Sequence, residues 1–122
     1  MRKPIDIRRC GLSVAVDQIG DAWMLMILWT SFDGVSRFDD YQKQLGVARN
    51  ILSNRLRRLV ALGILEKAPV REGGRRLEYR VTAKGEELRA PLAELRRWGQ
   101  RWSAPRAPAP RPAPCQAAAA AE

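Results

Sequence analysis

The side chains of this chain best suited to bind a polyanion are arginines in two groups. The first group, Arg49, Arg55, Arg57 and Arg58, lies in a stretch of helical spacing that contains no acidic residue. Like charges on one helix repel each other unless a counter-charge arrives, and guanidinium groups pair well with phosphate oxygens and with guanine. The second group lies in the segment REGGRR, residues 71–76. Both groups indicate a surface that binds nucleic acid.

Residues 48–62 have the spacing of an amphipathic helix. Leu52, Leu56 and Leu59 recur on one side, and Gly63 follows the last turn, where helices commonly stop. At about 100° per residue, the opposite side carries asparagine, serine and arginine, which pair with base edges or with phosphates. We predict base contacts from Asn50, Ser53, Asn54 and Arg57, and phosphate contacts from Arg49 and Arg58.

A β-hairpin is predicted directly after this helix. Residues 64–70 form one strand and residues 77–81 the other, in which Leu77, Tyr79 and Val81 alternate with polar residues. The two glycines of REGGRR permit a tight turn between the strands. A helix suited to the major groove with a basic hairpin beside it is the arrangement of a winged helix-turn-helix. The hairpin would then add phosphate contacts from Arg71, Arg75 and Arg76.

Four further helices are predicted to hold this unit in place. They cover residues 12–19, residues 23–32 with Asp21 as the N-cap, residues 38–45, and residues 82–102 with Thr82 as the cap. Pro91 should either kink the last of these helices or remove one of its backbone hydrogen bonds. The segment 23–32 is apolar nearly all round, so it should be central. The expected fold class is mainly α with a small β-hairpin, a winged helix-turn-helix.

The composition of the chain predicts how it divides into domains. The chain has 122 residues and a net charge of +9, and residues 1–102 carry +8 of that charge. We treat residues 1–102 as one DNA-binding domain and residues 103–122, mostly alanine, proline and arginine, as a flexible tail. No apolar run approaches the roughly 20 residues of a membrane span. We therefore expect a cytoplasmic protein with no membrane contact.

The composition favours neither an enzyme nor a metal-binding protein. The chain has no histidine and two cysteines, Cys10 and Cys115, near opposite ends, so neither a Cys/His zinc site nor a structural disulfide is expected. The aspartates have the positions of helix caps and turns, not those of a converging acid–base pair. We expect no enzyme activity, no cofactor and no metal.

Apolar side chains recur along the predicted first and last helices. A domain of about 100 residues buries proportionally little surface, and Trp98 and Trp102 exceed what one such core needs. This stripe either packs within its own subunit or pairs with a second copy, and the excess favours pairing. We expect a homodimer whose interface contains Leu12, Val16, Leu88, Leu92, Leu95, Trp98 and Trp102.

Several motifs, taken in order, resemble those of HxlR-type winged-helix regulators of bacterial transcription, distant relatives of the MarR group. The resemblance covers nearly all of residues 10–98. It departs from the family at Ala48, where a serine that could cap the helix is frequent, and the tail has no counterpart in the family pattern. The matching residues are Cys10, Asp17-Gln-Ile-Gly-Asp-Ala-Trp23, Arg37-Phe38, Leu52-Ser-Asn-Arg-Leu56, Leu62-Gly-Ile-Leu-Glu-Lys67 and Glu78-Tyr-Arg-Val-Thr-Ala-Lys-Gly85.

The resemblance implies regulation of transcription by a homodimer. The first and last helices would pair, two copies of the 48–62 helix would read a palindromic operator in double-stranded DNA, and the hairpin would contact flanking DNA. In some family members a cysteine at the position of Cys10 senses quinones, aldehydes, hypochlorite or other electrophiles. Arg8, Arg9 and the start of a helix would favour its thiolate, so Cys10 is a candidate sensor. The alternative is a small, inert residue buried at the dimer seam.

Other functions remain open from sequence alone. The polar side of the 48–62 helix could simply be solvated, the basic surface could bind RNA or DNA without reading sequence, or the winged helix could dock onto a protein. A strong preference for one duplex over random DNA would distinguish a regulator from these alternatives.

Overall fold

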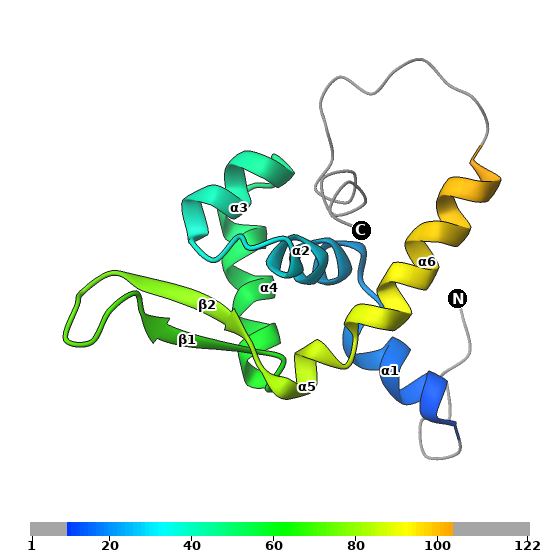
Figure 1. Cartoon of the computed structure of the whole chain (residues 1–122), viewed down its shortest axis with the longest axis horizontal. Helices are drawn as coiled ribbons and strands as arrows, with labels where there is room; N and C mark the ends of the chain where they lie inside the picture. The colour runs from blue at the N-terminus through cyan, green and yellow to red at the C-terminus, as the bar shows by residue number, and fades with distance from the viewer. Residues whose placement is uncertain (1–9, 104–122) are drawn as a thin grey trace.

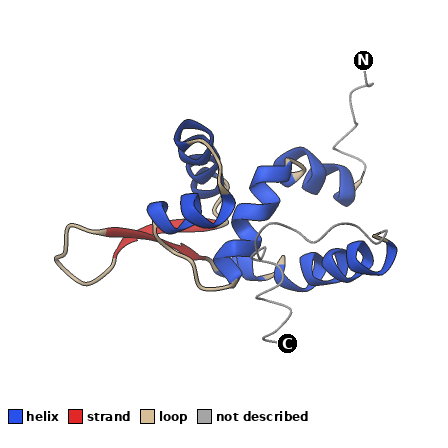
Figure 2. Cartoon of the chain, turned by 90° about the horizontal axis from the view of Figure 1, so that it is seen from above, coloured by secondary structure: helices blue, strands red, loops and turns tan. Residues whose placement is uncertain are grey.

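The computed structural model describes residues 10–103, which form six helices and a two-stranded hairpin (Figure 1). The hairpin projects from the helices as a wing (Figure 2), which confirms the expected fold class. Residues 104–122 of the predicted tail lie outside the described residues. In chain order the elements are α1 (Gly11–Ile19), α2 (Ala22–Phe32), α3 (Phe38–Leu45), α4 (Arg49–Ala61), β1 (Leu65–Pro69), β2 (Leu77–Val81), α5 (Ala83–Glu86) and α6 (Arg89–Trp102).

Helix α2 lies at the centre, as its apolar composition predicts. Side chains such as Met24 and Ile27 are fully buried, and α2 packs against α3, α4, α6 and β2. Its two buried hydroxyls bond within the helix: Thr30 Oγ1 donates to the Met26 carbonyl at 2.7 Å, and Ser31 Oγ to that of Ile27 at 2.9 Å. Burial of these polar groups therefore leaves no donor unpaired.

Helices α3 and α4 form the helix-turn-helix. The turn between them contains Gly46 with a φ of +65°, a left-handed conformation that favours glycine. The Tyr41 hydroxyl of α3 lies 2.6 Å from Ser31 Oγ of α2, which ties α3 to the centre of the core. The apolar side of α4 is buried as predicted, through Leu52, Leu56 and Leu59.

The hairpin forms with a shorter first strand than predicted. The strands pair antiparallel from Leu65 opposite Val81 to Pro69 opposite Leu77, so the predicted range 64–70 is one residue too long at each end. The N–H of Ile64 instead donates to a carbonyl of the last turn of α4. Gly73 has a φ of +74° and is the position of the turn where glycine is required.

The predicted single helix over residues 82–102 is wrong. Two helices, α5 and α6, occupy this range and are separated by a short turn. Thr82 caps the first of them by accepting from the Gly85 N–H at 3.1 Å, as expected. Pro91 lies in the first turn of α6, where its missing N–H leaves no helical hydrogen bond unmade. The other helices agree with the prediction to within one residue at each end.

Helices α1 and α2 meet at an angle of 87°. A Cβ atom at Gly20 would lie 2.4 Å from the Val16 carbonyl oxygen, so only glycine fits this bend. Asp21 then caps α2 by accepting from the Met24 N–H at 3.1 Å, as predicted. Within residues 10–103 no single helix is long and apolar enough to cross a bilayer, although the bent pair α1 and α2 passes that test by length and composition.

Candidate nucleic-acid interface

The side of α4 opposite its buried leucines is polar and open to solvent. Asn50, Asn54 and Arg57 are exposed, and Ser53 is half-buried beside them. Among the described residues, neither Arg57 nor Arg58 makes an ion pair or a hydrogen bond. The predicted base-contacting residues therefore share one accessible helix face, and two cations on that face have no internal partner.

The other two arginines of α4 have partners on neighbouring helices, which the sequence pattern did not indicate. Arg55 donates to Asp21 at 3.0 Å. Arg49 lies 3.6 Å from Asp39 and its guanidinium sits over the ring of Phe38, 4.6 Å from the centroid. The uncompensated positive charge of α4 is therefore smaller than its sequence suggests, although Arg49 itself remains exposed.

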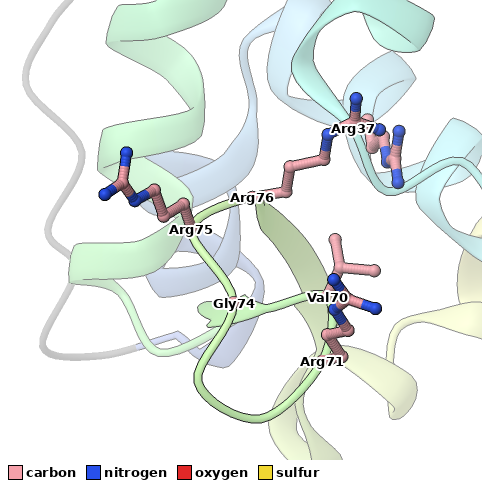
Figure 3. Close-up of a pocket in the computed structure, with 6 residues that line it drawn as sticks. All are labelled: Arg37, Val70, Arg71, Gly74, Arg75 and Arg76. Carbon is pink, nitrogen blue, oxygen red and sulfur yellow. The ribbon is translucent and has the colours of Figure 1, made fainter.

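The tip of the wing encloses a basic hollow of about 590 Å³. Figure 3 shows the side chain of Arg76 extending from the wing toward Arg37, which precedes α3. Among the described residues no acidic side chain lines the hollow. The side chain of Arg75 points away from Arg37 in Figure 3, so the pair that faces across the hollow is Arg76 and Arg37, and guanidinium groups suit a phosphate. The three predicted wing arginines are thus brought together with a fourth: the lining consists of Arg37, Val70, Arg71, Gly74, Arg75 and Arg76.

A second hollow, of about 520 Å³, connects the wing with α4. Arg49 from the start of α4 and Arg76 from the wing both line it, together with Arg37 and Lys43. Asp39 and Asp40 line it as well, so it is mixed in charge. The two arginine groups identified in the sequence therefore border one continuous surface.

Arg37 was not among the predicted contacts. It occupies the N-cap position of α3, the first helix of the helix-turn-helix. Helix N-termini carry partial positive charge and favour phosphate groups. An arginine directly before a predicted helix of the DNA-binding unit was therefore a usable sequence signal, and the structure strengthens it because Arg37 lines both hollows.

The middle of β2 is attached to the segment before α3. The Tyr79 N–H donates to the Ser36 carbonyl at 2.7 Å, and Ser36 Oγ donates to Glu78 at 3.2 Å. Arg80, which donates to Glu78 at 2.8 Å, and then Ser36 hold the pKa of that carboxyl below its ordinary range. These bonds fix the position of the wing relative to the helix-turn-helix.

An apolar groove of about 740 Å³ lies between α1 and α6, on the side away from the wing (Figure 1). The predicted interface residues divide into two sets. Leu88 and Leu92 pack against the core of their own chain. The others project into solvent, with Trp98 58% and Trp102 71% exposed; the exposed set is Leu12, Val16, Leu95, Trp98 and Trp102.

Cys10 is exposed and occupies the N-cap position of α1. The thiol makes no hydrogen bond of good capping geometry, but the backbone N–H of Ser13 lies near it. That N–H, followed by the Ser13 hydroxyl and the Leu12 N–H, lowers the pKa of the thiol. The expected helix-start effect is therefore present, whereas Arg8 and Arg9 lie outside the described residues.

A helix-turn-helix followed by a wing, with its second helix polar on the outward side, defines a winged helix-turn-helix protein. The chain belongs to the HxlR-like helix-turn-helix family, whose model matches residues 18–107. This confirms the resemblance drawn from the motifs. The family is one of transcriptional regulators and not of enzymes. Among residues 10–103 no group of side chains is placed to hold a metal ion.

Similar proteins include an HTH-type transcriptional regulator of Mycobacterium tuberculosis, 40% identical over 88 residues, which are 72% of this chain and 56% of the relative. The chain thus spans about half the length of that relative. The crystal structure of PA1607, described as a candidate transcription factor, is 40% identical with a TM-score of 0.75, covering 84% of this chain and 72% of PA1607. Quinone-bound YodB from Bacillus subtilis is 25% identical with a TM-score of 0.61, covering 75% of this chain and 98% of YodB. A diamide-treated form of YodB has the same sequence identity, 25%, and the same TM-score, 0.61.

Proposed function

We propose that this chain is a transcriptional regulator that binds a palindromic operator in double-stranded DNA as a homodimer. Helix α4 enters the major groove and presents Asn50, Ser53, Asn54 and Arg57 to the base edges. The phosphate contacts come from Arg37, Arg49, Arg58, Arg71, Arg75 and Arg76.

The observation that carries this proposal is that exposed arginines of α4 and of the wing border the same surface. Arg57 is exposed without an internal partner on α4, and Arg49 at the start of the same helix borders the hollow that Arg76 of the wing also lines. A binding surface that follows a helix and continues onto an adjacent hairpin matches the width of a groove and its flanking phosphates.

Selection of duplexes from a random pool tests this proposal directly. The full-length chain should enrich one palindromic sequence and bind it at least about 10³-fold more tightly than random duplex. Six phosphate contacts per subunit neutralise about twelve phosphates in a dimer, which gives a slope of log K against log salt near −11 at roughly −0.9 per phosphate. Equal affinity for every duplex and for RNA would instead indicate non-specific nucleic-acid binding. If the chain bound no nucleic acid, the remaining interpretation would be a winged helix that docks onto a protein.

The dimer itself is testable through its apolar groove. Replacing Trp98 by aspartate places a charge in the proposed interface of both subunits, and buried aromatic anchors typically contribute about 2 kcal/mol or more each. We expect the dimer dissociation constant to rise at least about 100-fold, measured by sedimentation equilibrium. Leu77 is also an exposed apolar residue but lies on the wing, so Leu77→Asp should leave the dimer intact. A monomeric native chain would contradict the proposed assembly.

Cys10 is the proposed point of regulation. Its thiolate adds to a quinone ring carbon and forms a C–S bond. One proton from water and the hydrogen lost from that ring carbon end on the two quinone oxygens, which gives a substituted hydroquinone, so no further oxidant is needed. Support comes from the exposure of the thiol, from its lowered pKa, and from the existence of quinone-bound YodB among the similar structures. The position of Cys10 next to α1 places the adduct beside the proposed dimer interface.

The lowered pKa has a measurable consequence. Because the thiolate is the reactive form, alkylation of Cys10 by iodoacetamide should reach half its maximal rate at a lower pH than alkylation of an ordinary cysteine. The rate is measured in a Cys115→Ser variant, with Cys115 in a Cys10→Ser variant as the internal comparison. Identical pH profiles for the two cysteines would remove the chemical basis of the sensor.

A further inference from the structure

Arg55 of α4 connects two groups that are far apart in the sequence. Its Nε and Nη2 atoms donate to the two carboxylate oxygens of Asp21 at 3.0 and 3.3 Å. Its remaining terminal nitrogen, Nη1, donates to Oδ1 of Asn54 at 3.1 Å. One guanidinium therefore bridges the cap of α2 and a side chain on the outward face of α4.

The ion pair holds the guanidinium in a fixed orientation. It is bidentate, which restricts the plane of the guanidinium as well as its distance, and the side chains of Arg55 and Asp21 are only 24% and 36% exposed. Asp21 is itself held, because it also accepts from the Met24 N–H at the start of α2. The Arg55 guanidinium holds the pKa of Asp21 below its ordinary range, so the carboxyl stays charged at neutral pH.

This fixed guanidinium determines which way the Asn54 amide faces. An amide oxygen has two acceptor sites. Arg55 occupies one, which leaves the second oxygen site and the amide N–H groups free. Asparagine recognises adenine by accepting from N6 and donating to N7 at the same time, so the orientation that Arg55 imposes preserves both required functions.

We infer that Arg55 is a positioning residue for sequence reading: Asp21 orients its guanidinium, and the guanidinium orients the amide of Asn54 toward the base edge. This inference rests on the proposed function, since it assigns a role only to a chain that reads sequence. It predicts that the bridge affects one base position and not the general affinity for DNA.

The experiment compares sequence preferences of variants selected against the same random duplex pool. Asn54→Ala first identifies the position that Asn54 reads. Arg55→Lys keeps the positive charge but replaces the rigid planar fork with a single rotatable ammonium group, which does not fix the orientation of Asn54 relative to Asp21. Discrimination at the Asn54 position should fall by roughly fivefold or more, within the range that one bidentate base contact supplies. Discrimination elsewhere and affinity for random duplex should stay within about twofold of the native values.

Two further variants keep the test decisive. Asp21→Asn preserves a good cap for α2 but removes the charge that orients Arg55, so it should weaken discrimination at the same position. Arg89→Lys alters a comparable arginine pair, with Glu86, and should change no base preference. An unchanged profile in Arg55→Lys and Asp21→Asn, or an equal loss on selected and random duplexes, would overturn the inference. Failure of the native chain to select any sequence would instead overturn the proposed function.

Discussion

Replacement of Arg57 by glutamate is expected to abolish selective DNA binding, with at least a 100-fold loss of affinity for the selected duplex. A good bidentate base contact supplies about 1–3 kcal/mol, and the new carboxylate is repelled by the phosphates on both sides of the groove, which adds to the loss. Gel-shift titration against the selected duplex measures the effect. Because Arg57 is exposed and makes no hydrogen bond or ion pair among the described residues, its replacement should leave the thermal unfolding midpoint nearly unchanged.

Arg101→Glu provides the matched control for this charge reversal. Arg101 is exposed near the end of α6, away from α4 and the wing, and the substitution changes the net charge by the same amount. Arg101 also lines the apolar groove between α1 and α6, so the control is valid only in a sample that stays dimeric. Size-exclusion chromatography of the same sample verifies that the dimer is retained. If Arg101→Glu weakened binding as much as Arg57→Glu, total charge and not the α4 face would govern the affinity. Selective binding retained by Arg57→Glu would exclude α4 as the reading helix.

Replacement of Gly85 by alanine is expected to destabilise the fold, opposite to the usual effect of this change within a helix. A Cβ atom at Gly85 would lie 2.4 Å from the Ile64 carbonyl oxygen and 2.9 Å from a Val81 methyl carbon. The first of these neighbours is backbone and cannot move aside without disturbing the start of the wing. Overpacking of this kind typically costs about 1–3 kcal/mol, and each kcal/mol lowers the melting temperature of a small domain by roughly 4–8 °C.

Gly99→Ala is the matched comparison for this prediction. Gly99 lies within α6, and a Cβ atom there meets no atom within 4 Å. Alanine at this site should stabilise the chain by roughly 0.5–1 kcal/mol through its higher helix propensity. Calorimetric unfolding of the two variants should therefore give shifts of opposite sign. Equal shifts would mean that the close approach of α5 to the wing strands does not exist in solution.

The elements that depend on a local residue pattern could be predicted from the sequence. Leu52, Leu56 and Leu59 recur with the period of a helix, and this regularity alone indicated both the buried side of α4 and the polar side opposite it. The cap at Asp21 and the paired strands of the wing also follow from neighbouring residues. Such features depend on interactions between residues that are close in the sequence, so the sequence is enough to predict them.

Features created by distant contacts could not be predicted in this way. The pairing of Arg55 with Asp21 joins residues 34 positions apart, and only the packing of α2 on α4 brings them together. Gly85 of α5 lies close to the carbonyl of Ile64, and the periodicity of the last segment contains no information about that approach. Arg37 had a local signal, its position directly before α3, but its proximity to the wing tip is a distant contact that the sequence does not indicate.

The wing is anchored through the middle of β2, by the bonds of Glu78 and Tyr79 to Ser36, while its tip at residues 71–76 projects beyond the helices (Figure 2). Its arginines are exposed, so exchanging them disturbs little of the packed interior. Point substitutions at the tip are therefore expected to leave the helical body folded. We expect the proposed DNA affinity of the wing to be adjustable separately from the stability of the domain.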